Sequence, residues 1–117
     1  MITLVYPYYD NGGMLERHSE EWSSYAPEVK AQLRAIVVDD GSPNDPAAAH
    51  VREVGFPVEL YRIKQNIVWN VPGARNLGMH VAPSGWCLLT DIDHLLAASE
   101  AEKLVNATRN QKLETRN

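Results

Sequence analysis

Four short apolar segments, each followed at once by polar or acidic residues, constrain the fold of this chain more than any other feature. The segments occupy residues 2–6, 33–38, 58–63 and 86–90. Segments of this length, rich in β-branched and other apolar residues and bounded by turn residues, are typical of buried strands. Polar groups follow all four of them, at residues 8–10, 39–42, 64–66 and 90–93. The sequence therefore predicts four strands that deliver polar side chains to one edge of a sheet, where open α/β sheets bind their ligands.

Helical patterns separate these segments. In the first of them, Leu15, His18, Trp22 and Tyr25 recur at intervals of three or four residues, which is the period of an amphipathic helix. An alternation of strands and helices predicts an α/β, Rossmann-like domain, with a mainly parallel four-stranded sheet flanked by helices. We expect residues 1–109 to form this single domain and the polar residues 110–117 to be a frayed tail.

The other three helices are predicted from their start signals. Asp45 precedes a proline, which predicts an N-cap and a short helix that runs to about residue 54. Pro72 opens the next helix, in which Gly78 allows a close approach to the sheet. The Ser99-x-x-Glu102 pattern is that of a capping box, and it predicts the start of the last helix.

Composition excludes several classes of protein. The net charge of −4 argues against a nucleic-acid partner, which needs clustered basic surface. The single cysteine, Cys87, lies in an apolar run, so we expect a buried core thiol and a reducing compartment. No apolar run approaches the roughly 20 residues that span a bilayer, and no basic segment precedes the first strand. These features predict a cytoplasmic protein without a membrane span.

Asp39 and Asp40 follow the second predicted strand. Adjacent side chains of an extended segment point in opposite directions, so only one of the two carboxylates can enter a cleft at the sheet edge. The other can hold the following turn, because aspartate readily accepts backbone N–H groups there. A carboxylate in the cleft only accepts hydrogen bonds, which suits a base N–H such as the imide of uracil.

Asp91 and Asp93 follow the fourth predicted strand. A spacing of two residues places both carboxylates on one side, where they repel each other unless a cation lies between them. Mg²⁺ or Mn²⁺ in phosphate sites is held by one or two carboxylates together with phosphate oxygens and water. The pair therefore predicts a divalent metal site, although an Asx-turn before the last helix is the simpler alternative. His94 is adjacent and is a weaker candidate ligand.

Positive charge and aromatic rings near the same edge complete the candidate site. Arg75 lies in the first turns of the third predicted helix, where its guanidinium and the helix N-terminus would both favour an anion. The alternative is a solvated surface arginine. Tyr8, Tyr9 and Trp69 lie near the predicted edge and could stack on a flat base, although aromatic residues more often serve packing.

Four motifs in series carry a resemblance to a known family. They are Pro-x-Tyr-Asp at 7–10, Val-Asp-Asp-Gly-Ser at 38–42, Gly-Ala-Arg-Asn-x-Gly at 73–78 and Thr-Asp-Ile-Asp at 90–93. In this order and spacing they resemble the nucleotide-sugar-binding half of the family 2 glycosyltransferases, which have the GT-A fold. The likeness covers about residues 2–96, and its motifs are specific together although each alone is weak.

The resemblance implies roles for individual residues. The loop from Pro7 to Tyr9 and the second acid, Asp40, would hold the uracil and ribose of a UDP-sugar, and Arg75 would lie near the nucleotide. The D-x-D segment would meet the ribose and a metal, Mn²⁺ or Mg²⁺, that bridges the diphosphate. The predicted nucleotide-binding residues are Pro7, Tyr8, Tyr9, Asp39, Asp40, Arg75, Asp91 and Ile92. The predicted metal ligands are Asp93 and, second to it, Asp91.

One departure from the family qualifies the predicted activity. Family members continue well beyond the D-x-D motif and supply there the acceptor site and, in inverting enzymes, the catalytic base. The carboxylates after Asp93 are Glu100, Glu102 and Glu114, none of which is a convincing base. We therefore expect a truncated transferase that is poorly active alone, or a non-catalytic nucleotide-sugar-binding module that a partner completes. The acceptor and the catalytic residue are not predicted.

A second class of protein shares some of these features. Receiver domains of response regulators are doubly wound α/β domains with an acidic pair after a strand and a phosphoacceptor aspartate about fifty residues later, which Asp39-Asp40 and Asp91 imitate. A receiver begins with its acidic-pair strand and has a further lysine-bearing strand after the acceptor. Here a strand and a helix come before the acidic pair, and only a helix is predicted after Asp91, so the transferase reading is favoured.

Overall fold

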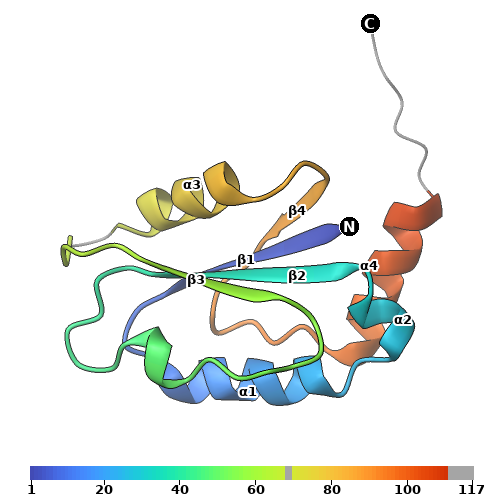
Figure 1. Ribbon diagram of the computed structural model, residues 1–117, viewed down its shortest axis with the longest axis horizontal. Coiled ribbons are helices and arrows are strands. Elements are labelled where there is room, and N and C mark those ends of the chain that lie inside the picture. Colours follow the sequence, from blue (N-terminus) through green and yellow to red (C-terminus); the bar gives the residue numbers. More distant parts are fainter. Residues whose placement is uncertain (68–69, 111–117) are drawn as a thin grey trace, which may run out of the picture.

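The computed structural model describes residues 1–67 and 70–110 of the chain. Its centre is a four-stranded parallel sheet with the strand order β3-β2-β1-β4 (Figure 1). The strands are β1 (Ile2–Tyr8), β2 (Leu33–Asp39), β3 (Val58–Arg62) and β4 (Trp86–Leu89). All four run in the same direction, so their carboxyl ends share one edge, as the sequence predicts.

Helices cover both faces of the sheet (Figure 1). One face carries α1, the short α2, the single turn η1 and α4, and the other carries α3 alone. The helical elements are α1 (Gly12–Ser23), α2 (Pro27–Lys30), η1 (Ala47–Ala49), α3 (Val71–Val81) and α4 (Ala98–Asn110). None of the described helices combines the length and hydrophobicity that crossing a membrane would require.

The two central strands are buried on both faces, which is why they read as continuous apolar runs. Alternation along each strand divides the side chains between two cores. Leu4 and Tyr6 pack toward α1 with Ala35 and Val37, whereas Val5 packs toward α3. The core on the α1 side is the larger, and its aromatic rings meet in tilted pairs.

Pro7 lies inside β1, which ends at Tyr8 and so runs two residues beyond the segment predicted at 2–6. Ile2 donates its backbone N–H to the Gln32 carbonyl beside β2, so residues at odd positions of β1 direct their N–H toward β4. The pairing of β4 with β1 ends at Val5. The missing N–H of Pro7 therefore faces a side where no strand requires it, which is where a sheet tolerates proline.

The helix predicted from residue 45 to about 54 is reduced to the single turn η1, and Asp45 is not its N-cap. The Asp45 carboxylate instead accepts the Gly12 N–H at 3.0 Å, at the start of α1. It also lies 2.5 Å from His50 Nε2, while Glu16 lies 2.6 Å from Nδ1. We call these three side chains, Asp45, His50 and Glu16, the His50 cluster. The two carboxylates raise the pKa of His50, and the contact lowers the pKa of Asp45.

The last helix begins before the predicted capping box, so Ser99 is a helical residue and not the cap. Its first N–H, on Ala98, donates to the Glu21 carboxylate of α1 at 3.0 Å. A side chain from another helix thus performs the capping that the local pattern predicted for Ser99. Of the predicted tail, only Asn110 is described, and it ends α4.

Cys87 is exposed, so the predicted core thiol is wrong. It lies in β4, which is an edge strand of only four residues. Apolar composition alone does not separate an edge strand from a central one.

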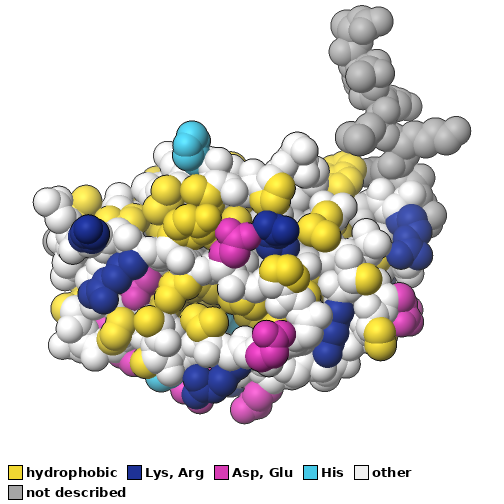
Figure 2. Space-filling view, in the orientation of Figure 1, with side chains coloured by type: hydrophobic (Ala, Val, Ile, Leu, Met, Phe, Trp, Pro, Cys, Tyr) yellow, Lys and Arg dark blue, Asp and Glu magenta, His cyan; other side chains and the backbone are white. Residues whose placement is uncertain are grey.

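On the face drawn in Figure 2, the basic side chains lie scattered among acidic and hydrophobic ones and form no continuous basic patch.

Candidate functional site

A cavity of about 350 Å³ opens at the carboxyl edge of the sheet. Its walls come from the end of β1, the loop after β2, the start of α3 and the loop after β4. The lining residues are Pro7, Tyr8, Tyr9, Asp40, Val71, Asp91, Ile92 and Asp93. The structure thus brings together residues that the sequence placed at three separate strand ends, and of the predicted site residues only Asp39 and Arg75 do not line the cavity.

Asp39 holds the loop after β2. Its carboxylate accepts the backbone N–H of Ser42 at 2.9 Å and that of Ala47 at 2.8 Å, and the residue is 1% exposed. This direction follows from the strand, because Val37 faces the α1 core and Asp39 is next in the same series. Asp39 is therefore directed away from the cavity, which is the turn-holding role that the sequence left open for one of the two acids.

Asp40 is the acid that reaches the cavity. Its backbone N–H donates to the Tyr8 carbonyl at 2.9 Å, which joins the loop after β2 to the end of β1. One carboxylate oxygen accepts the Asn70 side-chain amide at 2.9 Å. Asp40 is 5% exposed, and no Lys or Arg in the described residues forms an ion pair with it. A carboxylate in such a position favours further N–H donors.

The two tyrosines at the end of β1 are placed differently. Tyr8 is buried, and its hydroxyl donates to the Asp45 carbonyl at 2.6 Å; burial first, and then the Asp45 charge, raises its pKa to about 12. Its ring packs in the core on the α1 side, and the residue also lines the cavity. Tyr9 is exposed and donates to Asn66 Oδ1 at 3.1 Å, so it is the better placed of the two to stack on a base. Trp69 lies outside the described residues.

Asp91 and Asp93 lie in a tight turn after β4, closed by a hydrogen bond from the His94 N–H to the Asp91 carbonyl at 3.1 Å. The carbonyl of Ile92 between them lies 2.5 Å from Nε2 of the fully buried His18. Burial lowers the pKa of His18, so its imidazole is neutral, and a contact with a carbonyl requires that Nε2 carry the hydrogen. His18 thus fixes the D-x-D turn on α1. Sequence reasoning placed His18 in the core but missed this contact, because the partners are 74 residues apart.

Arg75 forms an ion pair with Asp91 through Nη2 and Oδ1. The two side chains are 37% and 51% exposed, so solvent screens the pair. Arg75 approaches the cavity from α3 without lining it. The pair neutralises one of the three carboxylates that line the cavity and leaves those of Asp40 and Asp93 without a cationic partner among the described residues.

The donor set fits a divalent cation that arrives with a phosphate. In the described part of the chain, no group of three or more His, Cys, Asp or Glu side chains could hold a metal ion. Asp91 and Asp93 nevertheless line one cavity, and Mg²⁺ or Mn²⁺ in phosphate sites commonly takes only one or two carboxylates, with phosphate and water oxygens in the remaining positions. His94 is not part of this set, since it lines a separate hollow of about 340 Å³ with Thr90, Leu95, Leu96 and Glu100.

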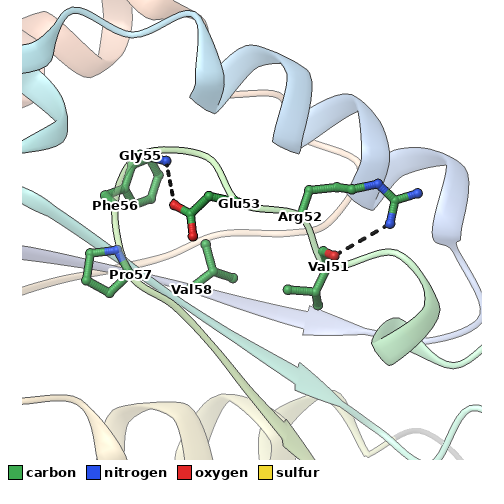
Figure 3. A pocket seen from close by; sticks show the side chains of 7 residues that line it. All are labelled: Val51, Arg52, Glu53, Gly55, Phe56, Pro57 and Val58. Carbon is green, nitrogen blue, oxygen red and sulfur yellow. Dashed lines mark hydrogen bonds between the residues drawn. The ribbon is translucent and has the colours of Figure 1, made fainter.

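A larger hollow, of about 630 Å³, lies at the opposite edge of the sheet, where β3 begins (Figure 3). Its lining residues are Val51, Arg52, Glu53, Gly55, Phe56, Pro57 and Val58. The polar groups there have local partners: Glu53 accepts the Gly55 N–H at 3.1 Å, and Arg52 donates to the Val51 carbonyl at 3.5 Å (Figure 3). The hollow lacks the convergent polar groups of the smaller cavity, so the smaller cavity is the candidate site.

Comparison with known proteins assigns this architecture to a class. The crystal structure of S. aureus TarS 1-349 superposes with a TM-score of 0.70 at 15% sequence identity, and the match covers 90% of this chain and 31% of TarS. It shows a shared fold, and it confirms the predicted α/β domain of the GT-A type. The chain spans about a third of the TarS chain that it matches.

The sequence gives the family. The model of glycosyl transferase family 2 matches residues 28–113, which is more than half of the chain. The chain therefore belongs to glycosyl transferase family 2, as its motifs predict, and not to the receiver domains. No curated protein matches it.

Proposed function

We propose that this chain binds a UDP-sugar donor in the cavity at the carboxyl edge of its sheet, through a divalent metal held at the D-x-D turn. The observation that carries the proposal is the convergence of Asp40, Asp91 and Asp93 on one cavity of about 350 Å³ in a member of a glycosyltransferase family. Residues 1–109 act as one nucleotide-sugar-binding domain in this proposal.

Each part of the donor has a proposed partner. The base lies between Tyr9 and Asp40, where the carboxylate accepts the uracil imide N–H, and Pro7 and Tyr8 form the inner wall. Asp39 contributes indirectly, because its two backbone contacts hold the loop that presents Asp40.

The diphosphate lies toward the D-x-D turn in this proposal. Asp93 is the main metal ligand, because Asp91 already has a partner in Arg75. A bound Mg²⁺ or Mn²⁺ would neutralise the diphosphate and stabilise it as a leaving group. Asp91 and Ile92, which line the cavity, contact the ribose. Arg75, which is paired with Asp91, supplies a second positive charge near the phosphates.

Sugar transfer also needs a base that deprotonates the acceptor. Among the described residues after Asp93, no carboxylate lines the donor cavity. Glu100 lies in the first turn of α4 and faces the neighbouring hollow of about 340 Å³. We therefore expect the 117-residue chain to bind the donor but to transfer little or no sugar by itself. The measurement is UDP release from UDP-glucose or UDP-galactose with and without acceptors, and robust acceptor-dependent turnover would contradict the expectation.

Calorimetric titration tests the binding proposal. UDP should bind in the presence of Mn²⁺ and bind much more weakly with EDTA, because the diphosphate and the carboxylates repel each other without the cation. At about a hundredfold excess over the dissociation constant, the ligand adds about 2.7 kcal/mol to the free energy of unfolding, so UDP with Mn²⁺ should raise the melting temperature by several degrees. If UDP binds equally tightly with Mn²⁺ and with EDTA, the proposed role of the D-x-D turn is wrong. If a folded sample does not bind UDP at all, the whole proposal is wrong.

A further inference from the structure

We infer that Asn70 is a specificity-determining residue of the donor site, which orients Asp40 and reads the base together with it. The side chain of Asn70 donates from Nδ2 to Asp40 Oδ1 at 2.9 Å, across 30 residues of sequence. The inference rests on the proposed function, because it concerns the base of the same nucleotide.

The environment of Asp40 makes this contact decisive. At 5% exposure the carboxylate has little access to water, and the Asn70 amide is its side-chain partner in the described part of the chain. Asn70 is also the N-cap residue of α3, so the contact places Asp40 beside the positive end of an eleven-residue helix. With one oxygen occupied by Asn70, the other is left for a donor on a ligand in the cavity that Asp40 lines.

The Asn70 side chain is confined at its other end by Gly73. A Cβ added to Gly73 would lie 2.2 Å from Asn70 Oδ1, so this oxygen fits closely over the glycine in the first turn of α3. The chemistry of the neighbour fixes the orientation of the amide, since only its NH₂ group can donate to a carboxylate. Asn70 is thus held between Gly73 and Asp40 with its NH₂ group toward the cavity wall.

The pair presents an acceptor next to a donor. The Asn70 NH₂ group has two hydrogens: one is directed at Asp40, and the other has no hydrogen-bond partner in the described part of the chain. Asn70 precedes Val71, which lines the cavity, so in this inference the second hydrogen serves the ligand. A free Asp40 oxygen beside this hydrogen matches the imide N–H and adjacent carbonyl of uracil. The corresponding edge of cytosine is inverted, with an acceptor nitrogen beside an amino group, and adenine is inverted in the same way. The bases of UDP and CDP have the same ring size and differ in this edge, so comparing the two affinities isolates the contribution of its hydrogen bonds.

Two substitutions test the inference by different routes. Asn70→Ala removes the donor, and Gly73→Ala displaces the Asn70 side chain without altering it. The second change places alanine in a helix, which is favourable to folding. Asn106→Ala, at an exposed position of α4, is the matched control. Calorimetry with Mn²⁺ then gives the dissociation constants for UDP and CDP, and melting temperatures without ligand report on folding.

The expected result is a loss of base selectivity. Loss of a hydrogen bond to a charged group should weaken UDP binding by about tenfold in Asn70→Ala and should leave the weaker CDP binding unchanged. Gly73→Ala should lower the ratio of UDP to CDP affinity in the same direction, and Asn106→Ala should not change it. Equal losses for UDP and CDP, or an unchanged affinity for UDP, would overturn the inference. A wild-type chain that binds UDP and CDP equally, with metal, would overturn the inference but retain donor binding, whereas no binding of either would remove both.

Discussion

Replacing Gly78 with alanine should destabilise the protein, although alanine is the better helix former. Gly78 is buried in α3, and a Cβ there would lie 2.3 Å from Val5 Cγ1 and 3.5 Å from Val38 Cγ2. Carbon atoms in good contact lie about 3.5–4.0 Å apart, so the first of these distances is more than about 1 Å too short. This is the close approach of helix and sheet that the sequence predicts at Gly78.

The size of the effect follows from two opposing contributions. Alanine should add about 1 kcal/mol to helix stability relative to glycine. Overpacking a tight core costs about 1–3 kcal/mol, and the upper part of that range applies because Val5 cannot yield. Val5 is fully buried in a central strand, and its β-branched side chain has little rotamer freedom. The net loss should be about 1–2 kcal/mol, which corresponds to a fall in melting temperature of roughly 5–15 °C.

Thermal unfolding followed by circular dichroism measures the loss, and Gly13→Ala in α1 is the matched control. A Cβ at Gly13 meets nothing within 4 Å, so this change should stabilise the protein by up to about 1 kcal/mol. In a Val5→Ala background, Gly78→Ala should cost less than it does in the wild type, because the methyl groups that the new Cβ meets are absent; a double-mutant cycle measures this difference. If Gly78→Ala raised the melting temperature as Gly13→Ala does, the packing argument would be refuted.

Three further predictions concern charge. Asp93→Asn should weaken Mn²⁺-dependent UDP binding more than Asp91→Asn does, and the reverse order in calorimetry would exchange their roles. Arg75→Gln should weaken UDP binding about tenfold through loss of a charge-assisted contact, yet should change the free energy of unfolding by no more than about 1 kcal/mol because the pair is half-exposed. The raised pKa of His50 means that its two carboxylate contacts stabilise the fold fully below the ordinary histidine pKa and less as pH rises through the raised value. The melting temperature of the wild type should therefore fall as the pH is raised from mildly acidic to alkaline. The melting temperature of His50→Gln should lack this fall over the same pH range.

The fold could be predicted because its main determinants are local. Apolar runs, helical spacing and turn residues mark the four strands and three of the helices, and parallel pairing follows from their alternation. The carboxyl ends then share one edge, which is why Asp40, Asp91 and Asp93 could be placed together from sequence. Local signals failed where a distant group took over a local role. Glu21 caps α4 in place of Ser99, and the Asp45 carboxylate serves the start of α1.

The contacts that organise the site are non-local and leave no pattern in the sequence. The hydrogen bond from Asn70 to Asp40 spans 30 residues, and the contact between His18 and the Ile92 carbonyl spans 74. Neither asparagine nor a core histidine has a spacing that would identify its partner. A search for a buried polar residue on an otherwise apolar helix face would have singled out His18, since a buried imidazole requires a hydrogen-bond partner.

The choice between Asp39 and Asp40 shows why side-chain direction needs the structure. Alternation requires that only one of them enter the cavity, but β2 is buried on both faces, so apolar residues at Val37 and Val38 give no indication of which face is which. The asymmetry comes from the helices: Val37 faces the core of α1, and Val38 faces that of α3. Asp39 therefore points toward η1, where it accepts a backbone N–H group, and Asp40 accepts a hydrogen bond from the N-cap residue of α3. The acid that contacts the start of α3 is thus the one left with an oxygen for a ligand, and the donor site depends on which helix covers which face.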